Sequence, residues 1–160
     1  RIVRDVAARQ EKLVAFATTG EETELDKTLV DALADPLVHL VRNAVDHGIE
    51  ASPARRAAGK PEQGVVRVAA RREGGGVVIE VTDDGRGMDP ARMRRAAVEK
   101  GILDEGAAAR LTDAEALDLT FAAGFSTAAE VSDISGRGVG MDAVRTAVAR
   151  LGGTVSLASR

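Results

Sequence analysis

Polar side chains that could do chemistry gather on one side of a predicted helix over residues 37–48. These side chains recur at intervals of three and four residues, which at 3.6 residues per turn places them on one stripe. They are His39, Arg42, Asn43, Asp46 and His47. An exposed stripe more often carries Lys and Glu pairs. The pattern therefore indicates either a binding site or a solvated helix with two incidental histidines, because a short motif does not decide between them.

Each of these side chains suits a particular role. Asn43 offers a neutral amide oxygen of the kind that Mg²⁺ accepts beside phosphate oxygens and water, although a helix-surface amide is the simpler interpretation. His39 lies one turn earlier and could transfer a proton or orient a water, or serve only a structural role. Arg42 and His47 suit phosphate contacts better than metal binding. No zinc-ligand spacing and no Ser-His-Asp arrangement occurs in the sequence.

A carboxylate at the end of a predicted strand is the second candidate. Apolar residues alternate from Val77 to Val81, and Asp83 is the next residue on the same face. The pattern predicts a buried carboxylate that could accept a hydrogen bond from an exocyclic amine, while Gly85 and Gly87 would let a flat ring approach the backbone. A turn-capping aspartate is the alternative.

Three glycines precede the last predicted helix, at positions 136, 138 and 140. Their backbone N–H groups and the positive end of the helix dipole could bind phosphate. The stretch is not a P-loop, because no Lys-Ser/Thr follows it and no strand precedes it. A flexible glycine linker remains the alternative.

The polar stripe needs a helix with an apolar side. Leu37, Leu40, Val41 and Ala44 have the spacing of such a side. Asp35 and Pro36 predict an N-cap and a first-turn proline, while Gly48 followed by Ile49 predicts a C-terminal glycine cap; Asp26 predicts the cap of a separate helix ending near residue 34.

The other elements follow from turn residues and periodicity. Residues 12–18 predict a strand that ends in a turn at residues 19–22, and residues 54–58 predict a helical connector. Residues 64–72 and 77–83 predict an antiparallel hairpin around the glycines of residues 73–76. Further predictions are a helix from Asp89 and Pro90 to Gly101, a capping box at residues 112–115, a long loop over residues 120–140, a helix from Met141 to Leu151 and a strand at residues 154–158.

Composition limits the class of protein. The 160 residues are 44% hydrophobic and 29% charged, which suits a single globular domain, and the net charge of −3 argues against nucleic-acid binding. No cysteine is present, and no apolar run approaches the roughly 20 residues of a membrane span. Residues 1–4 do not open a signal peptide, so we expect a cytoplasmic protein without membrane insertion. From its first residues, we expect the chain to be a piece of a longer protein.

Four motifs occur in the order of the GHKL ATPase boxes. They are His39-Leu40-Val41-Arg42-Asn43, Asp83-Asp84-Gly85-Arg86-Gly87, Gly124-Phe125-Ser126-Thr127 and Gly136-Arg137-Gly138-Val139-Gly140. Residues 40–50 and 136–142 more narrowly resemble the catalytic domain of the CheA-type chemotaxis histidine kinases. The resemblance covers nearly the whole chain as one domain over residues 1–160.

The resemblance implies the Bergerat fold, an α/β two-layer sandwich in which a mixed sheet packs against three main helices and a lid covers ATP. Asn43 would hold Mg²⁺, Asp83 would bind the adenine amino group, and His39 would replace the glutamate with which other GHKL relatives activate water. His39 and Asn43 are thus the implied catalytic residues. The implied ATP-binding residues are Arg42, Asn43, Asp46, His47, Asp83, Gly85, Gly87, Met88, Arg92, Ser126, Thr127, Gly136, Arg137, Gly138, Val139, Gly140 and Met141. Phe121 and Phe125 would belong to the lid.

The sequence departs from the family pattern in two places. Arg92 and Ala96 stand where the family commonly has lysines that reach the phosphates, and Arg95 is a candidate substitute. The chain also ends before the family's Gly-Thr turn and last strand, so we expect a fragment truncated at both ends.

The expected activity is transfer of the γ-phosphoryl group of Mg-ATP to a histidine on a separate phosphoacceptor domain. The implied partners are this domain, the dimerisation and regulatory domains of a larger kinase and, through them, a chemoreceptor and a coupling protein. Two alternatives stay open: a nucleotide-binding signalling module that is inactive alone, and a GHKL ATPase that hydrolyses ATP.

Overall fold

The chain folds into two compact units, Arg1–Arg86 and Gly87–Arg160. The computed structural model describes residues 12–125 and 140–159. The predictions for residues 126–139 therefore lie outside the described residues. The prediction of a single domain over the whole chain stays a prediction, and each unit is described here by itself.

The first unit is built on a sheet of three described strands in the order β1-β2-β3. Strands β1 (Val14–Thr19) and β2 (Gly64–Glu73) are parallel, with Val14 opposite Gly64, whereas β2 and β3 (Gly76–Asp83) are antiparallel. The predicted mixed α/β arrangement and the predicted antiparallel hairpin are thus confirmed. Strand β1 begins two residues later than predicted.

Two glycines close the hairpin. Gly74 and Gly75 have φ angles of 57° and 81°, and Glu73 pairs with Gly76 across the turn. Positive φ at both central residues is the mark of a type I′ turn, whose twist matches that of the two strands. The glycine run therefore fixes the register that places Asp83 opposite Val66.

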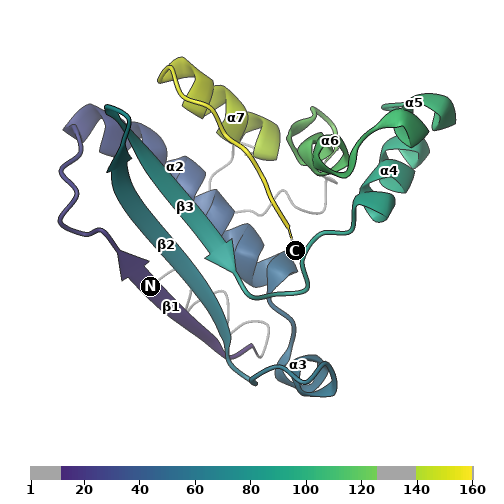
Figure 1. Cartoon of the computed structure of the whole chain (residues 1–160), viewed down its shortest axis with the longest axis horizontal. Helices are drawn as coiled ribbons and strands as arrows, with labels where there is room; N and C mark the ends of the chain where they lie inside the picture. The colour runs from purple at the N-terminus through teal and green to yellow at the C-terminus, as the bar shows by residue number, and fades with distance from the viewer. Residues whose placement is uncertain (1–11, 126–139, 160) are drawn as a thin grey trace. The chain divides into compact units, whose positions relative to one another are not determined.

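One long helix, α2 (Lys27–Asn43), covers one face of the sheet (Figure 1). Its N-cap is Asp26, whose side chain accepts a hydrogen bond of 2.8 Å from the Thr28 backbone N–H, as predicted. The prediction of a second helix beginning at Asp35 and Pro36 is wrong, because Pro36 lies inside α2.

Pro36 stays in the helix although it removes a backbone donor. Leu33, Pro36 and Leu40 follow the spacing of one apolar face, and Pro36 is buried. Because this face continues across the proline without a break, packing outweighs the local preference for a helix start at that position.

The core of the first unit lies between α2 and the sheet. Buried residues of the helix end pack with Val66 of β2, and half-buried valines of all three strands complete the layer. The buried members are Val41, Ala44, Val45, Ile49 and Val66. This core holds the C-terminal end of α2 against the sheet.

The end of α2 differs from the predicted glycine cap. Residues Ala44–Gly48 form a π-helical turn, η1, in which the Ile49 N–H donates to the Ala44 carbonyl oxygen at 2.8 Å. Gly48 is not among the glycines of positive φ, so it does not end the helix by the predicted mechanism. A short helix, α3 (Ser52–Ala57), follows with Pro53 in its first turn, near the predicted connector.

The second unit is helical among its described residues. Its helices are α4 (Pro90–Glu99), α5 (Glu105–Arg110), α6 (Asp113–Asp118), the 3₁₀ turn η2 (Leu119–Phe121) and α7 (Met141–Arg150). Asp89 caps α4, and Thr112 and Glu115 form the predicted capping box. Helix α5 was not predicted, and η2 replaces the beginning of the predicted long loop.

Packing within the second unit explains η2. Phe121 is buried, with the Arg145 guanidinium 4.4 Å from the centre of its ring, and Arg145 also donates to Asp118 at 2.6 Å. Arg145 of α7 thus stabilises η2. The two elements are far apart in the sequence, so no local pattern predicts this contact.

The predicted strand at residues 154–158 is wrong, because these described residues form no strand. Instead the Ser159 hydroxyl accepts a 2.8 Å hydrogen bond from the Met88 N–H.

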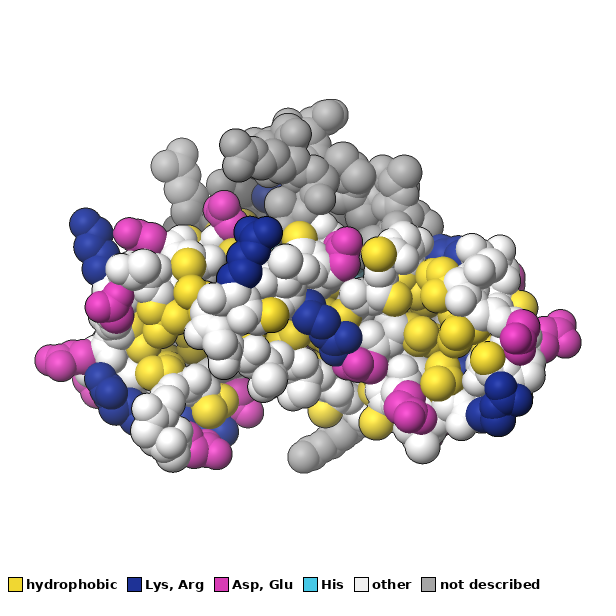
Figure 2. All heavy atoms as spheres, turned by 90° about the horizontal axis from the view of Figure 1, so that it is seen from above, with side chains coloured by type: hydrophobic (Ala, Val, Ile, Leu, Met, Phe, Trp, Pro, Cys, Tyr) yellow, Lys and Arg dark blue, Asp and Glu magenta, His cyan; other side chains and the backbone are white. Residues whose placement is uncertain are grey.

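Acidic and basic side chains are mixed over the face shown in Figure 2. Within residues 12–125 and 140–159, the helices are too short or too polar to cross a membrane.

Candidate nucleotide site

Asp83 lies against the end of the α2 region with no room between them. A Cβ atom added to Gly48 would lie 2.8 Å from Oδ1 and 3.0 Å from Oδ2 of Asp83. Side chains do not pack at such distances, so the close approach depends on glycine at position 48. The π-helical turn and its last residue thus bring the helix backbone to the carboxylate.

Gly85 completes this arrangement from the other side. A Cβ atom on Gly85 would lie 2.1 Å from the Gly48 carbonyl oxygen and 2.7 Å from Oδ1 of Asp83. The Gly85 N–H donates to Oδ1 of Asp83 at 2.9 Å, and the Arg86 N–H donates to the Gly48 oxygen at 2.9 Å. Two glycines and two hydrogen bonds therefore fix the carboxylate between a strand end and a helix end.

The Asp83 side chain is exposed, so the prediction of a buried carboxylate is wrong. The half-buried stripe from Val77 to Val81 is present, but Asp83 is the last residue of β3 and extends beyond the core. A surface hollow is lined by Asp83 together with Val65, Arg67, Thr82 and Asp84. Exposure leaves the carboxylate accessible to a solute.

The polar stripe on α2 is confirmed at its centre. Nδ2 of Asn43 and Nε2 of His39 lie 3.1 Å apart, one turn from each other. If the amide nitrogen donates, the imidazole must carry its proton on Nδ1. His39, Arg42, Asn43 and Asp46 are half-buried, and His47 is exposed.

Lys12 holds the π-helical turn and was missed by the sequence analysis. Its Nζ donates to the carbonyl oxygens of Val45 and Asp46, both at 2.7 Å. A cation at the end of a helix satisfies carbonyls that have no partner within the helix. Burial lowers the pKa of Lys12; Asp46 and Glu50 oppose this effect, and the charge of Arg86 adds to it.

Arg55 is the second residue that the sequence analysis missed. Its side chain is fully buried, and it donates to Glu50 at 3.1 Å, to the Asp84 carboxylate at 2.8 Å and to the Pro61 carbonyl at 2.7 Å. The predicted connector therefore places a paired, buried guanidinium behind the turn that follows Asp83. A basic residue in a short polar helix gives no periodic signal for such a role.

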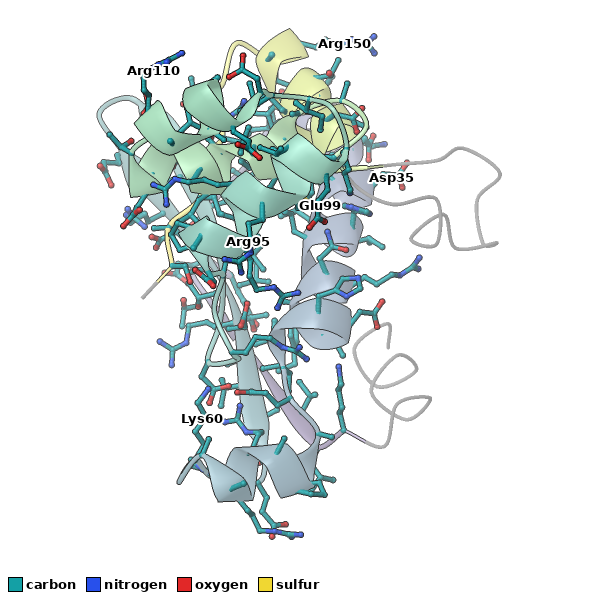
Figure 3. The ribbon with its side chains drawn as sticks, turned by 90° about the vertical axis from the view of Figure 1, so that its right-hand side faces the viewer. Asp35, Lys60, Arg95, Glu99, Arg110 and Arg150 are labelled. Atoms are coloured by element: carbon teal, nitrogen blue, oxygen red, sulfur yellow. The ribbon has the colours of Figure 1, made fainter. Side chains whose placement is uncertain are left out.

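Lys60 reaches the same turn from the segment after α3, beside which it lies in Figure 3. Its Nζ donates to the Gly85 carbonyl oxygen at 2.7 Å and to Glu50 at 2.8 Å. Burial would raise the pKa of Glu50, but hydrogen bonds from Lys60 and the backbone and the charges of Lys60 and Arg55 lower it overall. Glu50 is thereby held ionised between two cations.

The remaining predicted residues fall in two groups. Gly87, Met88, Arg92, Gly140 and Met141 lie in the second unit, where Arg92 is exposed, Met141 is buried, and Gly140 is the N-cap residue of α7. The others, Ser126, Thr127, Gly136, Arg137, Gly138 and Val139, lie outside the described residues. Among residues that the structure describes, no group of three or more His, Cys, Asp or Glu side chains could hold a metal ion.

Comparison with known protein families identifies the family of this chain. Residues 32–160 match the family of histidine kinase-, DNA gyrase B- and HSP90-like ATPases. The chain belongs to this family. The match begins within α2 and includes the hairpin and the second unit, and it confirms both the GHKL resemblance and the predicted α/β fold class.

Individual members of this ATPase family are similar over the whole chain. The chemotaxis protein CheA of Treponema pallidum is 52% identical over 159 residues, which are 99% of this chain and 19% of that protein. The sensor histidine kinase CheAY of Helicobacter pylori is 46% identical over 99% of this chain and 20% of its own length. CheA of Rhizobium meliloti is 48% identical over 100% of this chain and 21% of its own length. The chain thus spans about a fifth of each of these relatives.

Proposed function

We propose that this chain is the ATP-binding catalytic domain of a chemotaxis protein-histidine kinase. It binds Mg-ATP and provides the γ-phosphoryl group for transfer to a histidine on a separate phosphoacceptor domain. The proposal rests on the family to which the chain belongs and on relatives that carry the names CheA and sensor histidine kinase.

The arrangement of Asp83, Gly48 and Gly85 is the observation that carries the nucleotide part of the proposal. An exposed carboxylate fixed between two glycines, each with the Cβ position occupied by neighbouring atoms, is suited to a flat ring with an exocyclic amine. In this role Asp83 accepts a hydrogen bond from the adenine amino group. The glycines keep the carboxylate in one position before adenine binds.

Asn43 is proposed to hold Mg²⁺ through its amide oxygen. The hydrogen bond between Nδ2 of Asn43 and Nε2 of His39 fixes the orientation of the amide, which suits a cation that demands regular geometry. Mg²⁺ takes few protein ligands when phosphate oxygens and waters supply the others. When bound, the ion neutralises charge on the phosphates.

Phosphoryl transfer then needs little covalent chemistry from the chain. An imidazole nitrogen of the acceptor forms a bond to the γ-phosphorus as the bond from that phosphorus to the leaving oxygen of ADP breaks. Positioning and charge stabilisation supply most of the catalysis in such reactions. His39 stands where hydrolysing relatives have a water-activating glutamate, which favours transfer over hydrolysis.

Further ATP-binding residues are proposed to be Arg42, Asp46, His47, Met88, Arg92, Met141 and the residues from Ser126 to Gly140 named above, with Arg42 and His47 facing the phosphates. The acceptor is proposed to be outside residues 1–160, since His39 and His47 are the two histidines of the sequence and both belong to the proposed site. The wider partners are proposed to be the dimerisation and regulatory domains of a longer kinase, with a chemoreceptor and coupling protein acting through them in the cytoplasm.

The test is phosphotransfer in trans. The chain, Mg²⁺ and ATP labelled at the γ-phosphate are incubated with a separate phosphoacceptor domain of a CheA-type kinase. We expect label on the acceptor domain and none on the chain itself. No label on the acceptor would overturn the kinase proposal, and steady phosphate release without an acceptor would identify a hydrolysing ATPase instead.

A further inference from the structure

We propose that Glu50, Arg55, Lys60 and Asp84 form a positioning network that makes the site selective for a 6-aminopurine. The network contacts no proposed ligand directly. It acts by holding the turn after β3, which fixes the positions of Asp83 and Gly85. This inference rests on the proposed role of Asp83 in adenine binding. It concerns four other residues, which have no part in the proposed function.

The first part of the network fixes Asp84. Arg55 donates to its carboxylate at 2.8 Å and to its carbonyl oxygen at 3.2 Å, while the other carboxylate oxygen accepts a 2.8 Å bond from the Val65 N–H. The Asp84 N–H donates in turn to the Val65 oxygen at 3.2 Å. Asp84 is therefore held from β2 on one side and from α3 on the other.

The second part fixes Gly85. Lys60 donates to the Gly85 oxygen at 2.7 Å and to the Asp84 oxygen at 3.2 Å, and Glu50 pairs with both Lys60 and Arg55. Glu50 follows the π-helical turn by two residues, so the network joins the end of α2 to the turn after β3.

The last step leads from the turn to the carboxylate. The Gly85 N–H donates to Oδ1 of Asp83, and Gly85 lies against the Gly48 carbonyl. If the Gly85 peptide shifts, the Asp83 oxygen that it orients shifts too. Since Asp83 discriminates bases only through one amine hydrogen bond, small displacements should weaken base selectivity before they weaken phosphate binding.

Lys60 is the informative position for a test. Arg55 is fully buried with charged partners, and removing one partner of a buried ion pair destabilises a protein strongly. The Lys60 side chain is 32% exposed, so Lys60→Met removes the donor to Gly85 with less risk to folding. Lys60→Arg keeps a cationic donor near the same oxygen.

The experiment measures dissociation constants of the 160-residue chain for ATP and for inosine triphosphate, which has an oxygen in place of the 6-amine. We expect the parent to prefer ATP, and Lys60→Met to reduce this preference by about 3- to 10-fold. Lys60→Arg should recover part of it. Arg56→Met is the matched control, because Arg56 is exposed in α3 and its ion-pair partner among the described residues is the exposed Glu62.

Three results would overturn the inference. If folded Lys60→Met keeps the ATP preference of the parent, the network does not position the base-reading carboxylate, while the proposed function stands. If the parent itself fails to bind ATP or binds both nucleotides equally, the assigned role of Asp83 fails and the inference fails with it. An equal loss in Arg56→Met would show a general charge effect, which also contradicts the inference.

Discussion

Gly48 makes the clearest prediction at the scale of single residues. In Gly48→Ala the new Cβ would lie 2.8 Å from Oδ1 of Asp83, so the carboxylate must move. We expect ATP affinity to fall several-fold, which corresponds roughly to the free energy of one displaced hydrogen bond. The helical content should be retained. Isothermal titration measures the affinity, and circular dichroism measures the helix.

Gly76→Ala is the control for that substitution. A Cβ on Gly76 has its nearest neighbour at 3.7 Å, an ordinary contact, and Gly76 is not among the glycines of positive φ. Affinity should stay at the parent value. An unchanged affinity in Gly48→Ala as well would remove Asp83 from the proposed adenine site.

Asp83→Asn tests the carboxylate itself. The amide keeps the size of the side chain but loses the charge that strengthens a hydrogen bond from an amine, and hydrogen bonds to charged groups contribute about 1.5–3 kcal/mol. We expect ATP to bind about 10- to 100-fold more weakly. Glu80→Gln, an exposed change in the same strand, should leave the affinity unchanged, and a loss common to both variants would argue against a specific role.

Glu50 gives a prediction that depends on pH. Its pKa in the folded protein lies below the ordinary 4.5, so as the pH falls the unfolded chain takes up a proton first. Ionised Glu50 therefore stabilises the fold above about pH 4.5, and this contribution disappears as the pH falls through the lower folded pKa.

The measurement is urea unfolding of the parent and of Glu50→Gln at several pH values. We expect Glu50→Gln to be less stable near pH 7 and the difference to shrink at acid pH. Glu62→Gln, which lacks a buried partner, should show little difference at any pH. A stability difference for Glu50→Gln that stays constant down to pH 3 would contradict the network of ionised partners.

At the scale of elements, the N-cap of α2 makes a quantitative prediction. Asp26 accepts the 2.8 Å hydrogen bond from the Thr28 N–H at the start of a helix of 17 residues. Asp26→Ala should lower the free energy of unfolding by about 1 kcal/mol, and Asp35→Ala should not lose a cap, because Asp35 lies inside the helix. Equal effects of the two changes would restore the predicted second helix start.

Local signals predicted the elements whose ends are set by nearby residues. Gly74 and Gly75 fixed the hairpin turn, and Thr112 and Glu115 fixed the start of α6, because each device acts within four residues. Pro36 misled for the complementary reason. Its neighbours in sequence indicate a helix start, whereas its neighbours in space, the buried face of α2, keep it inside the helix.

The site was predictable where a functional group follows a period and unpredictable where it depends on distant contacts. His39 and Asn43 were predicted to lie one turn apart on one stripe, and their side chains do lie together, 3.1 Å apart. Asp83 was placed correctly on its strand but not in its exposure, because a face period does not say where the core ends. Lys12 and Arg55 act on residues about 30 positions away, which no local pattern encodes.

At the scale of the whole molecule, the division into two units affects how nucleotide binding should be observed. The residues proposed to bind the adenine amine and the metal, Asp83 and Asn43, both lie in the unit Arg1–Arg86. A ligand that binds only the folded state stabilises it by about 2.7 kcal/mol at 100 times its dissociation constant. Mg-ATP should therefore stabilise at least this unit.

Hydrogen exchange with and without Mg-ATP measures this stabilisation separately for each unit. We expect greater protection of the backbone N–H groups in β2, in β3 and at the end of α2 when Mg-ATP is added. In Asn43→Ala the protection with Mg-ATP should fall to that with ATP and a chelator, because the metal has lost its proposed ligand. If Asn43→Ala keeps the full magnesium effect, Asn43 is not the metal ligand. If the first unit gains no protection in the parent, the adenine and metal roles both fall, even where the second unit responds.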